Sequence, residues 1–374
     1  MNLATNKTIP IIDLGIHYEN LRDEINDAVN KSLKSTQYIL GPNVEAFEKE
    51  LSDFLECSYV ISCANGTDAL VLALKALDIK TGDEVITVSN SYFATSEAIA
   101  LVGATPVFID INEDDFNIAT SKIEEAITSK TRAIIPVHLY GQPCDIDKII
   151  EIAKKHNLYV IEDTAQAIGA KYKNKNVGTF GDIGTTSFYP TKNLGACGDG
   201  GALFTNHKNI AEKLKLLRHH GSPKRYVHDC IGLNSRLDDI QAAILRVKLK
   251  YLEKWNKARL TVANHYNELF KDIKEVCTPV IKPNRTHVFH QYTIKVKSRD
   301  LVHEKLKEKG VTTIIYYPIP IHEQKAFSYL TERNKHPLLI TKKITKEILS
   351  LPMYPELKKE DQEYILNCMK EIFK

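Results

Sequence analysis

The sequence predicts an α/β protein with a mostly parallel sheet covered by helices on both faces, followed by a smaller α+β domain. Apolar runs of strand length alternate with helical patterns through the first two thirds of the chain, and such alternation is typical of parallel βαβ units. The runs are continuously apolar, as expected of strands buried on both faces. The last third combines an alternating strand pattern with helices. We therefore expect a large domain at residues 1–250 and a small C-terminal domain at residues 251–374.

Length and composition indicate a globular protein without a nucleic-acid or membrane partner. The chain has 374 residues, of which 43% are hydrophobic and 26% charged, enough to bury a large core. Its 50 basic and 47 acidic residues leave a net charge of +3, too small a bias for nucleic-acid binding. The uncharged stretches, such as residues 98–109, are all shorter than a membrane span, and the first residues lack a signal-peptide pattern. We expect a cytoplasmic protein.

The cysteines and histidines do not form a recognisable metal site. Seven cysteines are scattered along the chain without a CxxC pair, which favours reduced thiols over a disulfide framework. Three histidines fall between residues 219 and 228, but no carboxylate or cysteine pattern completes a site there. We expect no metal ion.

The elements of the large domain follow from the period of their apolar residues. Residues 9–14 form an extended segment that leads into a first helix, and a second helical pattern begins at residues 41–43. Apolar runs predict strands at residues 59–63, 84–88, 106–110, 132–137, 158–163, 185–189 and 202–205. Helical patterns predict helices at residues 69–77, 92–102, 121–127, 146–155 and 210–218.

A helical pattern without proline or glycine extends from about residue 237 to residue 269 and predicts one long helix where the two domains meet. In the small domain, residues 290–296 alternate like an edge strand and residues 299–309 are helical. Residues 312–317 predict a second strand, which ends at Pro318.

Lys192 is the first candidate functional residue. It follows a strand that breaks at Pro190, and a glycine-rich turn at residues 198–201 comes after it. A lysine just past a strand end can form a Schiff base with a carbonyl cofactor. Most lysines are simply solvated, so Lys192 alone does not decide the function.

A carboxylate and an anion site strengthen this interpretation. The apolar strand at residues 158–163 ends in Glu162 and Asp163, and catalytic groups of open α/β sheets lie at the carboxyl ends of strands. A lysine and a carboxylate are what pyridoxal 5'-phosphate (PLP) requires of a protein. In addition, Gly66 and Thr67 begin a helix, where backbone N–H groups can bind a phosphate.

Six segments together resemble the DegT/StrS sugar aminotransferases, which have the aspartate-aminotransferase fold. They occur in the family's order at residues 66–70, 82–85, 137–141, 162–166, 185–201 and 232–237. The resemblance extends from about residue 8 to residue 325. It implies a fold type I PLP enzyme with a mostly parallel seven-stranded sheet and PLP as its cofactor.

The resemblance also implies site residues. Lys192 would attach the cofactor and carry a proton, and Asp163 would keep the pyridine nitrogen protonated. The other expected cofactor contacts are Gly66, Thr67, Tyr92, Gln166, Ser187 and Asn234. Asn234 would reach the phosphate of the neighbouring subunit, which makes the active form a homodimer with shared sites. The expected substrate contacts are Tyr189, Tyr226, Tyr316 and Tyr317.

The function implied by the resemblance is transfer of an amino group from L-glutamate to C3 of a dTDP-linked 3-keto-6-deoxyhexose. The product would be a dTDP-3-amino-3,6-dideoxyhexose for lipopolysaccharide O-antigen, another surface glycan or an antibiotic sugar. The first alternative is C4 amination of a UDP- or dTDP-linked 4-keto-6-deoxyhexose. A PLP enzyme of another reaction type would lack the segment at residues 232–236, and a non-enzymatic PLP-fold sensor would lack Lys192 or Asp163.

Asn65 stands where many family members have Ser, and Tyr316 stands where many have His. The second departure falls among the expected substrate contacts and leaves the cofactor residues unchanged. His138 has no acidic neighbour in the sequence and lies within an apolar run, so we expect it to be structural.

Overall fold

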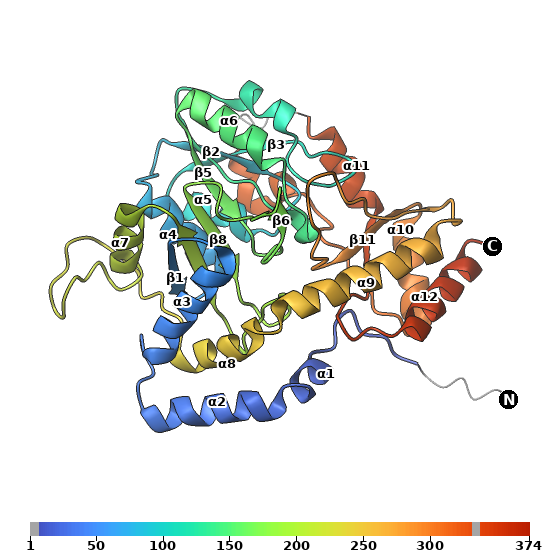
Figure 1. The fold of residues 1–374 in the computed structure, drawn as a ribbon. Helices are drawn as coiled ribbons and strands as arrows, with labels where there is room; N and C mark the ends of the chain where they lie inside the picture. The colour runs from blue at the N-terminus through green and yellow to red at the C-terminus, as the bar shows by residue number, and fades with distance from the viewer. Residues whose placement is uncertain (1–6, 331–336) are drawn as a thin grey trace.

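The computed structural model describes residues 7–330 and 337–374, and its largest feature is a seven-stranded sheet (Figure 1). In spatial order the strands are β1 (Tyr59–Cys63), β9 (Gly201–Thr205), β8 (Ile183–Ser187), β5 (Tyr159–Asp163), β4 (Thr131–Ile134), β2 (Glu84–Val88) and β3 (Thr105–Ile109). Of these, β9 alone runs antiparallel to its neighbours; the other pairs are parallel. The expected mostly parallel seven-stranded sheet is confirmed.

Helices cover both faces of this sheet. Ile61 of β1 packs into an apolar cluster with α4 (Gly66–Ala76), α5 (Ala94–Leu101) and α7 (Lys208–Leu217). Val60, the preceding residue, packs on the opposite face with α3 (Pro42–Leu55) and α8 (Asp239–Leu249). Further along that face lies α6 (Ile146–His156). Successive side chains of a strand point to opposite faces, so a continuously apolar run is buried on both sides.

The long helix expected at residues 237–269 is two helices, α8 and α9 (Leu252–Phe270), separated at Lys250 and Tyr251. Neither proline nor glycine causes the break. The Tyr251 ring stacks on Trp255 at 5.8 Å between ring centroids, and its hydroxyl donates to Glu24 of α2 (Arg22–Ser35). These tertiary contacts outweigh the helical propensity of the sequence.

The C-terminal part contains a separate antiparallel sheet of three strands, β10 (Val276–Cys277), β11 (Tyr292–Val296) and β12 (Ile348–Leu351). The expectation of an edge strand at residues 290–296 is wrong, because β11 lies in the middle and pairs on both sides. Its alternating pattern arises from polar residues that are nevertheless buried, such as Thr293, whose hydroxyl bonds to that of Ser350 at 2.8 Å.

Two further expectations about secondary structure are wrong. Residues 312–317 form no strand; Ile314 makes one bridge to Ser350, after which the chain crosses to the large sheet, where the Tyr316 carbonyl accepts the Tyr140 hydroxyl. The helix expected at residues 121–127 is a pair of 3₁₀ turns, η1 (Thr120–Lys122) and η2 (Glu124–Ala126). In this short segment, Ile123 is buried without a full α-helical turn.

The remaining elements are helices, 3₁₀ turns and short strands outside the seven-stranded sheet. They are α1 (Leu14–Glu19), η3 (Leu139–Gly141), β6 (Lys171–Tyr172), β7 (Lys175–Asn176), α10 (Arg299–Glu308), η4 (Ile321–Glu323), η5 (Lys325–Leu330), α11 (Leu339–Glu347) and α12 (Lys359–Ile372). No helix within residues 7–330 and 337–374 is long and apolar enough to cross a membrane. In the same ranges, no three His, Cys, Asp or Glu side chains gather into a possible metal site. The domain boundary at residue 250 stays a prediction.

Candidate active site

Two neighbouring strands place the candidate catalytic residues at one edge of the large sheet. Strands β5 and β8 are parallel, and Asp163, the last residue of β5, lies opposite Thr185. Strand β8 ends at Ser187, and Lys192 follows five residues later. The two strand ends are therefore adjacent, as the parallel arrangement requires.

A tight turn brings Lys192 back towards Asp163. The Lys192 N–H donates to the Tyr189 carbonyl at 2.8 Å, and a Cβ on Gly195 would lie 2.3 Å from the Pro190 carbonyl oxygen, so the turn requires glycine there. Burial lowers the pKa of the Lys192 amine to about 8, although the nearby Asp163 charge acts in the opposite direction. An amine with this pKa is partly neutral near pH 7 and can act as a nucleophile.

Asp163 is buried and held at both oxygens. Its Oδ1 accepts the Ala165 N–H at 3.1 Å, and its Oδ2 accepts the Thr95 hydroxyl at 2.9 Å. An ionised carboxylate offers further lone pairs, so these two bonds leave Asp163 able to accept a third donor.

The N-terminus of α4 meets the end of β8 in an anion-binding arrangement. The Asn65 side chain caps the helix by accepting the Asp68 N–H at 2.8 Å. A Cβ on Gly66 would lie only 2.7 Å from the Ser187 Cβ, so glycine is needed for the helix start to approach the strand. Helix N–H groups beside the hydroxyls of Thr67 and Ser187 suit a phosphate.

Gln166 and Tyr92 flank the same edge. The Gln166 Oε1 accepts the Tyr140 N–H at 2.6 Å, and its Nε2 donates to the Tyr317 hydroxyl at 3.1 Å. Tyr92 is 61% exposed, and its ring centroid lies 6.1 Å from that of Tyr317. An exposed aromatic face next to buried polar groups is suited to stacking on a flat cofactor ring.

The four tyrosines expected to contact substrate are not all brought together. The Tyr316 and Tyr317 rings are 5.7 Å apart, and burial, with a contribution from Tyr189, raises the pKa of Tyr316. Tyr226 instead contacts Arg225 and is 82% exposed. It lies on the loop after α7, which projects away from the sheet at the left of Figure 1. Asn234 is exposed at the base of this loop, in a bridge with His219.

Glu162, the residue before Asp163 in β5, forms a buried pair with His138 that the sequence did not reveal. His138 Nε2 is 3.1 Å from Glu162 Oε2, and both side chains are fully buried. Because His138 Nδ1 accepts the Cys144 N–H at 2.9 Å, the ring proton is on Nε2 and points at Glu162. His138 is structural as expected, but its acidic partner lies 24 residues later. Only the position of Glu162 beside Asp163 could have indicated it.

The Glu162 carboxylate is satisfied from several directions. It accepts N–H groups from Gly178, Phe180 and Gly181, each at 2.8 Å. Burial alone would raise the pKa of Glu162, but the His138 and backbone hydrogen bonds outweigh it and lower that pKa. This network fixes the end of β5, from which Asp163 extends.

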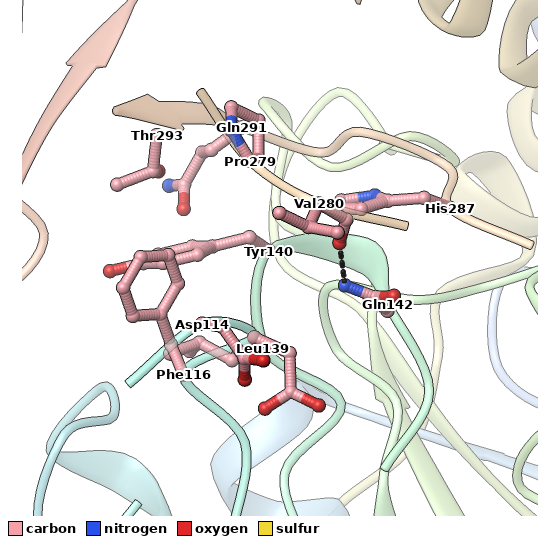
Figure 2. A pocket seen from close by; sticks show the side chains of 11 residues that line it. Asp114, Phe116, Leu139, Tyr140, Gln142, Pro279, Val280, His287, Gln291 and Thr293 are labelled. Atoms are coloured by element: carbon pink, nitrogen blue, oxygen red, sulfur yellow. Dashed lines mark hydrogen bonds between the residues drawn. The ribbon is translucent and has the colours of Figure 1, made fainter. Parts of the chain in front are cut away.

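Tyr140 supports the site from the other side and forms a wall of a small pocket (Figure 2). Figure 2 shows side chains from the segments that follow β3 and β4 facing the segment that precedes β11, with Gln142 donating to the Val280 carbonyl at 2.9 Å. The pocket is lined by Asp114, Asp115, Phe116, Leu139, Tyr140, Gln142, Pro279, Val280, His287, Gln291 and Thr293. Because the Tyr140 N–H also holds Gln166, this pocket lies behind the candidate site.

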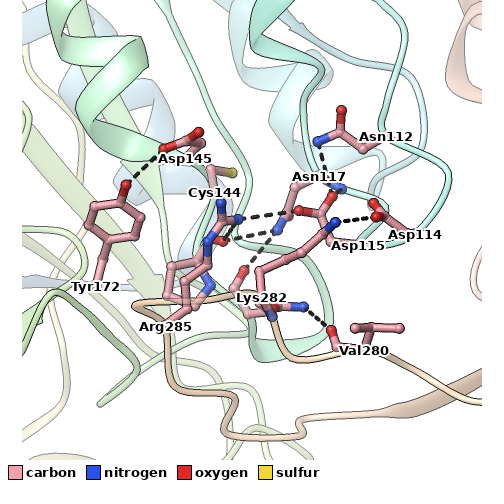
Figure 3. Close-up of polar contacts among 12 residues, drawn as sticks. Asn112, Asp114, Asp115, Asn117, Cys144, Asp145, Tyr172, Val280, Lys282 and Arg285 are labelled. Atoms are coloured by element: carbon pink, nitrogen blue, oxygen red, sulfur yellow. Dashed lines mark hydrogen bonds and ion pairs between the residues drawn. The ribbon is translucent and has the colours of Figure 1, made fainter.

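A cluster of polar contacts joins the same two parts of the chain (Figure 3). Arg285 donates to the Pro143 carbonyl at 2.9 Å and pairs with Asp115 at 3.2 Å. Lys282 pairs with Asp114. These contacts connect the segment between β10 and β11 to the segments that follow β3 and β4, and they stabilise the wall of the pocket near Tyr140.

Solved structures with the same fold include an aminotransferase from Brucella abortus, which is 39% identical, with a TM-score of 0.94 over 97% of this chain and 99% of its own. DesV from S. venezuelae is 38% identical, with a TM-score of 0.94 over 97% of this chain and 98% of its own. NtdA from Bacillus subtilis, solved with the cofactor PMP bound, is 34% identical, with a TM-score of 0.91 over 98% of this chain and 85% of its own. The fold is therefore that of the fold type I PLP aminotransferases.

Three curated relatives align with almost the whole chain. A pleiotropic regulatory protein of Geobacillus stearothermophilus is 46% identical over 98% of this chain and 99% of its own. The UDP-N-acetyl-3-dehydro-α-D-glucosamine 3-aminotransferase of Acidithiobacillus ferrooxidans is 45% identical over 96% of each. The dTDP-3-amino-3,6-dideoxy-α-D-galactopyranose transaminase of Aneurinibacillus thermoaerophilus is 45% identical over 96% of this chain and 98% of its own.

The chemistry of the donor set fits PLP: Lys192 can attach an aldehyde, Asp163 can accept from a ring nitrogen, and Gly66 lets the start of α4 lie against Ser187, where both can donate to a phosphate. The model of one aminotransferase family matches residues 19–370, nearly the entire chain. The chain therefore belongs to the DegT/DnrJ/EryC1/StrS aminotransferase family and is a PLP-dependent transaminase.

Proposed function

We propose that this transaminase moves the amino group of L-glutamate to C3 of a dTDP-linked 3-keto-6-deoxyhexose. The observation that carries the proposal is the chemistry named for its relatives. The Aneurinibacillus enzyme makes a dTDP-3-amino-3,6-dideoxy sugar, and the Acidithiobacillus enzyme also aminates C3. Both are 45% identical to this chain over nearly its full length.

The residues at the strand ends have complementary proposed roles. Bound PLP supplies an electron-accepting ring for the carbon that gains or loses the amine. Lys192 attaches the cofactor and moves the proton at the reacting carbon, for which a pKa near 8 is suitable. Asp163 accepts a hydrogen bond from the protonated pyridine nitrogen. Residues at the start of α4, with Ser187, hold the phosphate through N–H and hydroxyl donors.

The remaining contacts shape the site around the substrate. Tyr92 would stack on the cofactor ring, and Gln166 would contact the ring from its edge. Tyr189, Tyr316 and Tyr317 supply hydroxyls and apolar faces for the deoxysugar. The Tyr316 ring lies next to the Tyr317 ring, and Tyr189 is close enough to Tyr316 to affect its pKa, which supports this role for the three residues.

We also propose a homodimer in which Asn234 and Tyr226 serve the partner's site. Both side chains are exposed, and Ile231 between them is 88% exposed. A projecting loop with exposed apolar residues is typical of a surface that binds a protein. The loop also carries Arg225, whose guanidinium suits a diphosphate.

The proposed setting is the cytoplasm, where reduced thiols are usual; all seven cysteines are free. The product would supply amino sugar for a surface glycan or an antibiotic. A reaction that generates a nucleotide-linked 3-keto sugar must precede this one.

A kinetic panel tests the proposal. Purified protein would be assayed with L-glutamate and nucleotide-linked sugars that differ in ketone position (C3 or C4) and in nucleotide (dTDP or UDP). The expected result is the highest kcat/KM with the dTDP-linked 3-keto-6-deoxyhexose, because displacing the reacting carbon by about 1 Å can cost on the order of 10²-fold. A higher kcat/KM with a 4-keto sugar would overturn the assignment to C3.

A UDP-linked 3-keto sugar is the second candidate, favoured by the name of the Acidithiobacillus relative. The same panel separates it from the first: a preference for UDP with retention of the C3 ketone would change the nucleotide and keep the position of the amine.

The Tyr316 hydroxyl falls among the proposed substrate contacts, so a Tyr316→Phe variant should change KM for the sugar more than KM for glutamate.

A further inference from the structure

A chain of two hydroxyls ends on the Asp163 carboxylate. The Thr95 hydroxyl lies 2.9 Å from Asp163 Oδ2, and the Ser91 hydroxyl lies 3.2 Å from that of Thr95. All three residues are at least 95% buried. Ser91 and Thr95 flank the exposed Tyr92, so one turn of chain presents an aromatic ring outwards and two hydroxyls inwards.

The direction of these hydrogen bonds follows from the charge of the carboxylate. An ionised carboxylate can only accept, and a threonine hydroxyl has one proton to donate. Thr95 therefore donates to Asp163, and Ser91 must donate to Thr95. Hydroxyls aligned in this way polarise one another and strengthen the last bond of the chain.

The two oxygens of Asp163 are held from different elements. Thr95 of α5 donates to Oδ2, while the Ala165 N–H, just beyond β5, donates to Oδ1. With one donor on each oxygen, rotation of the carboxylate would break at least one hydrogen bond. A hydrogen bond to the charged form also favours that form.

We propose that Thr95, oriented by Ser91, is a positioning residue that holds the Asp163 carboxylate aimed at the pyridine nitrogen of PLP. This inference rests on the proposed role of Asp163. No bond is made or broken by Thr95; it holds its own proton towards Asp163 while Asp163 accepts from the ring nitrogen. Without this donor, the carboxylate would draw the shared proton away from the ring.

Thr95 could instead contribute only to side-chain packing around α5. Matched substitutions distinguish this packing role from the positioning of Asp163. Thr95→Val keeps the shape and removes the donor, whereas Thr95→Ser keeps the donor and removes a methyl group. Ser96 provides a control on the same helix, because its buried hydroxyl has no hydrogen-bond partner within the described part of the chain. Ser96→Ala should therefore leave the cofactor unaffected.

The decisive experiment records the nitrogen-15 chemical shift of the pyridine nitrogen in holoenzyme loaded with labelled PLP, together with kcat and KM. For Thr95→Val we expect the shift to move towards that of a neutral pyridine and kcat to fall about ten- to hundred-fold, with KM for glutamate nearly unchanged. Ser91→Ala should move both readouts in the same direction but less. Thr95→Ser should retain most of the wild-type shift and rate.

Two results would overturn the inference: a wild-type nitrogen shift in Thr95→Val, or equal damage in Thr95→Ser and Thr95→Val. Titration of the apoenzymes with PLP, followed by absorbance, checks that each variant still folds and binds. An Asp163→Asn holoenzyme with a wild-type shift would instead contradict the proposed role of Asp163 itself. Failure of the inference is thereby separated from failure of the proposed function.

Discussion

At Lys192, burial and the charge of Asp163 act in opposite directions on one amine. Burial dominates and lowers the pKa to about 8 from the ordinary 10.5. A lysine attacks an aldehyde as the neutral amine, so the fraction of neutral Lys192 sets how fast the apoenzyme binds PLP covalently.

The covalent attachment of PLP should therefore depend on pH with a midpoint near 8. We expect the attachment rate of apoenzyme, followed by stopped-flow absorbance, to rise with pH through this value. Asp163 raises the pKa of Lys192, so Asp163→Asn should shift the midpoint to lower pH. A midpoint near 10.5 in the wild type would show that Lys192 is not buried as described.

Replacing Lys192 should also stabilise the apoenzyme. Because its folded pKa is depressed, the unfolded state binds the proton more readily, and the cost to stability is complete below about pH 8 and fades as the pH rises towards 10.5. Lys192→Met removes this cost, so the free energy of unfolding near neutral pH should increase by roughly 3 kcal/mol. Urea unfolding of both apoenzymes at neutral and strongly alkaline pH measures it; a gain that does not shrink at alkaline pH would contradict the explanation.

The same substitution should abolish transamination. Loss of a positioned proton-transfer group costs on the order of 10²- to 10⁴-fold in rate, in addition to loss of covalent attachment. Single-turnover measurements on Lys192→Met with glutamate test this expectation, and near-normal turnover would remove Lys192 from the mechanism.

The Lys192 and Asp163 pair could be predicted from sequence because each residue follows an apolar strand, and parallel strands end at one edge. The side-chain partners of Asp163 and Glu162 could not be predicted. Thr95 and His138 occur in an ordinary helix and an ordinary apolar run, and only folding brings them to β5. The family resemblance predicts that Tyr226 and Tyr316 both contact the substrate, whereas within one chain Tyr226 lies on a projecting loop.

At the level of elements, the end of β5 depends on the buried contact between His138 and Glu162. His138→Leu would leave a buried carboxylate without its side-chain partner, and we expect the free energy of unfolding to fall by about 3 kcal/mol. The exposed pair of His156 and Glu124, at 3.0 Å, is the matched control: His156→Leu should change stability little. Equal losses of unfolding free energy in His138→Leu and His156→Leu would mean that burial of the pair of His138 and Glu162 does not contribute to stability.

The pH dependence of this contribution has a definite sign. The pKa of Glu162 is lowered in the folded protein, so its stabilisation is present above the ordinary carboxyl pKa and is lost as the pH falls through the folded value. The difference between wild type and His138→Leu in chemical denaturation should therefore shrink in acid.

Elements with strong local patterns were predicted well, and those shaped by tertiary contacts were not. The strands of the large sheet match continuous apolar runs, since burial on both faces leaves a clear signal. The break between α8 and α9 leaves no such signal, because Tyr251 turns the chain through contacts with Trp255 and α2. Similarly, β11 has the pattern of an edge strand because Thr293 is buried against Ser350.

At the scale of the whole molecule, the proposed shared site makes a prediction about mixed dimers. Lys192→Ala and Asn234→Ala proteins should each be impaired. If Asn234 serves the partner's site, a hybrid dimer has one site with both lesions and one with neither, so mixing the two proteins should restore activity. Absence of restoration, after mass spectrometry has demonstrated hybrid dimers, would place Asn234 in its own chain's site; a fully active monomer would exclude sharing altogether.

The central claim, that Lys192 carries the cofactor opposite Asp163, is tested most directly by borohydride reduction of the holoenzyme and mass mapping of its peptides. Reduction makes the link between PLP and its lysine permanent. The chain offers an internal comparison in Lys248, a buried lysine that donates to the Gly195 carbonyl at 2.7 Å. We predict one cofactor per chain, attached to Lys192, with loss of the visible absorption band. Label on Lys248 or any other lysine, or a cofactor that reduction does not retain, would contradict the account.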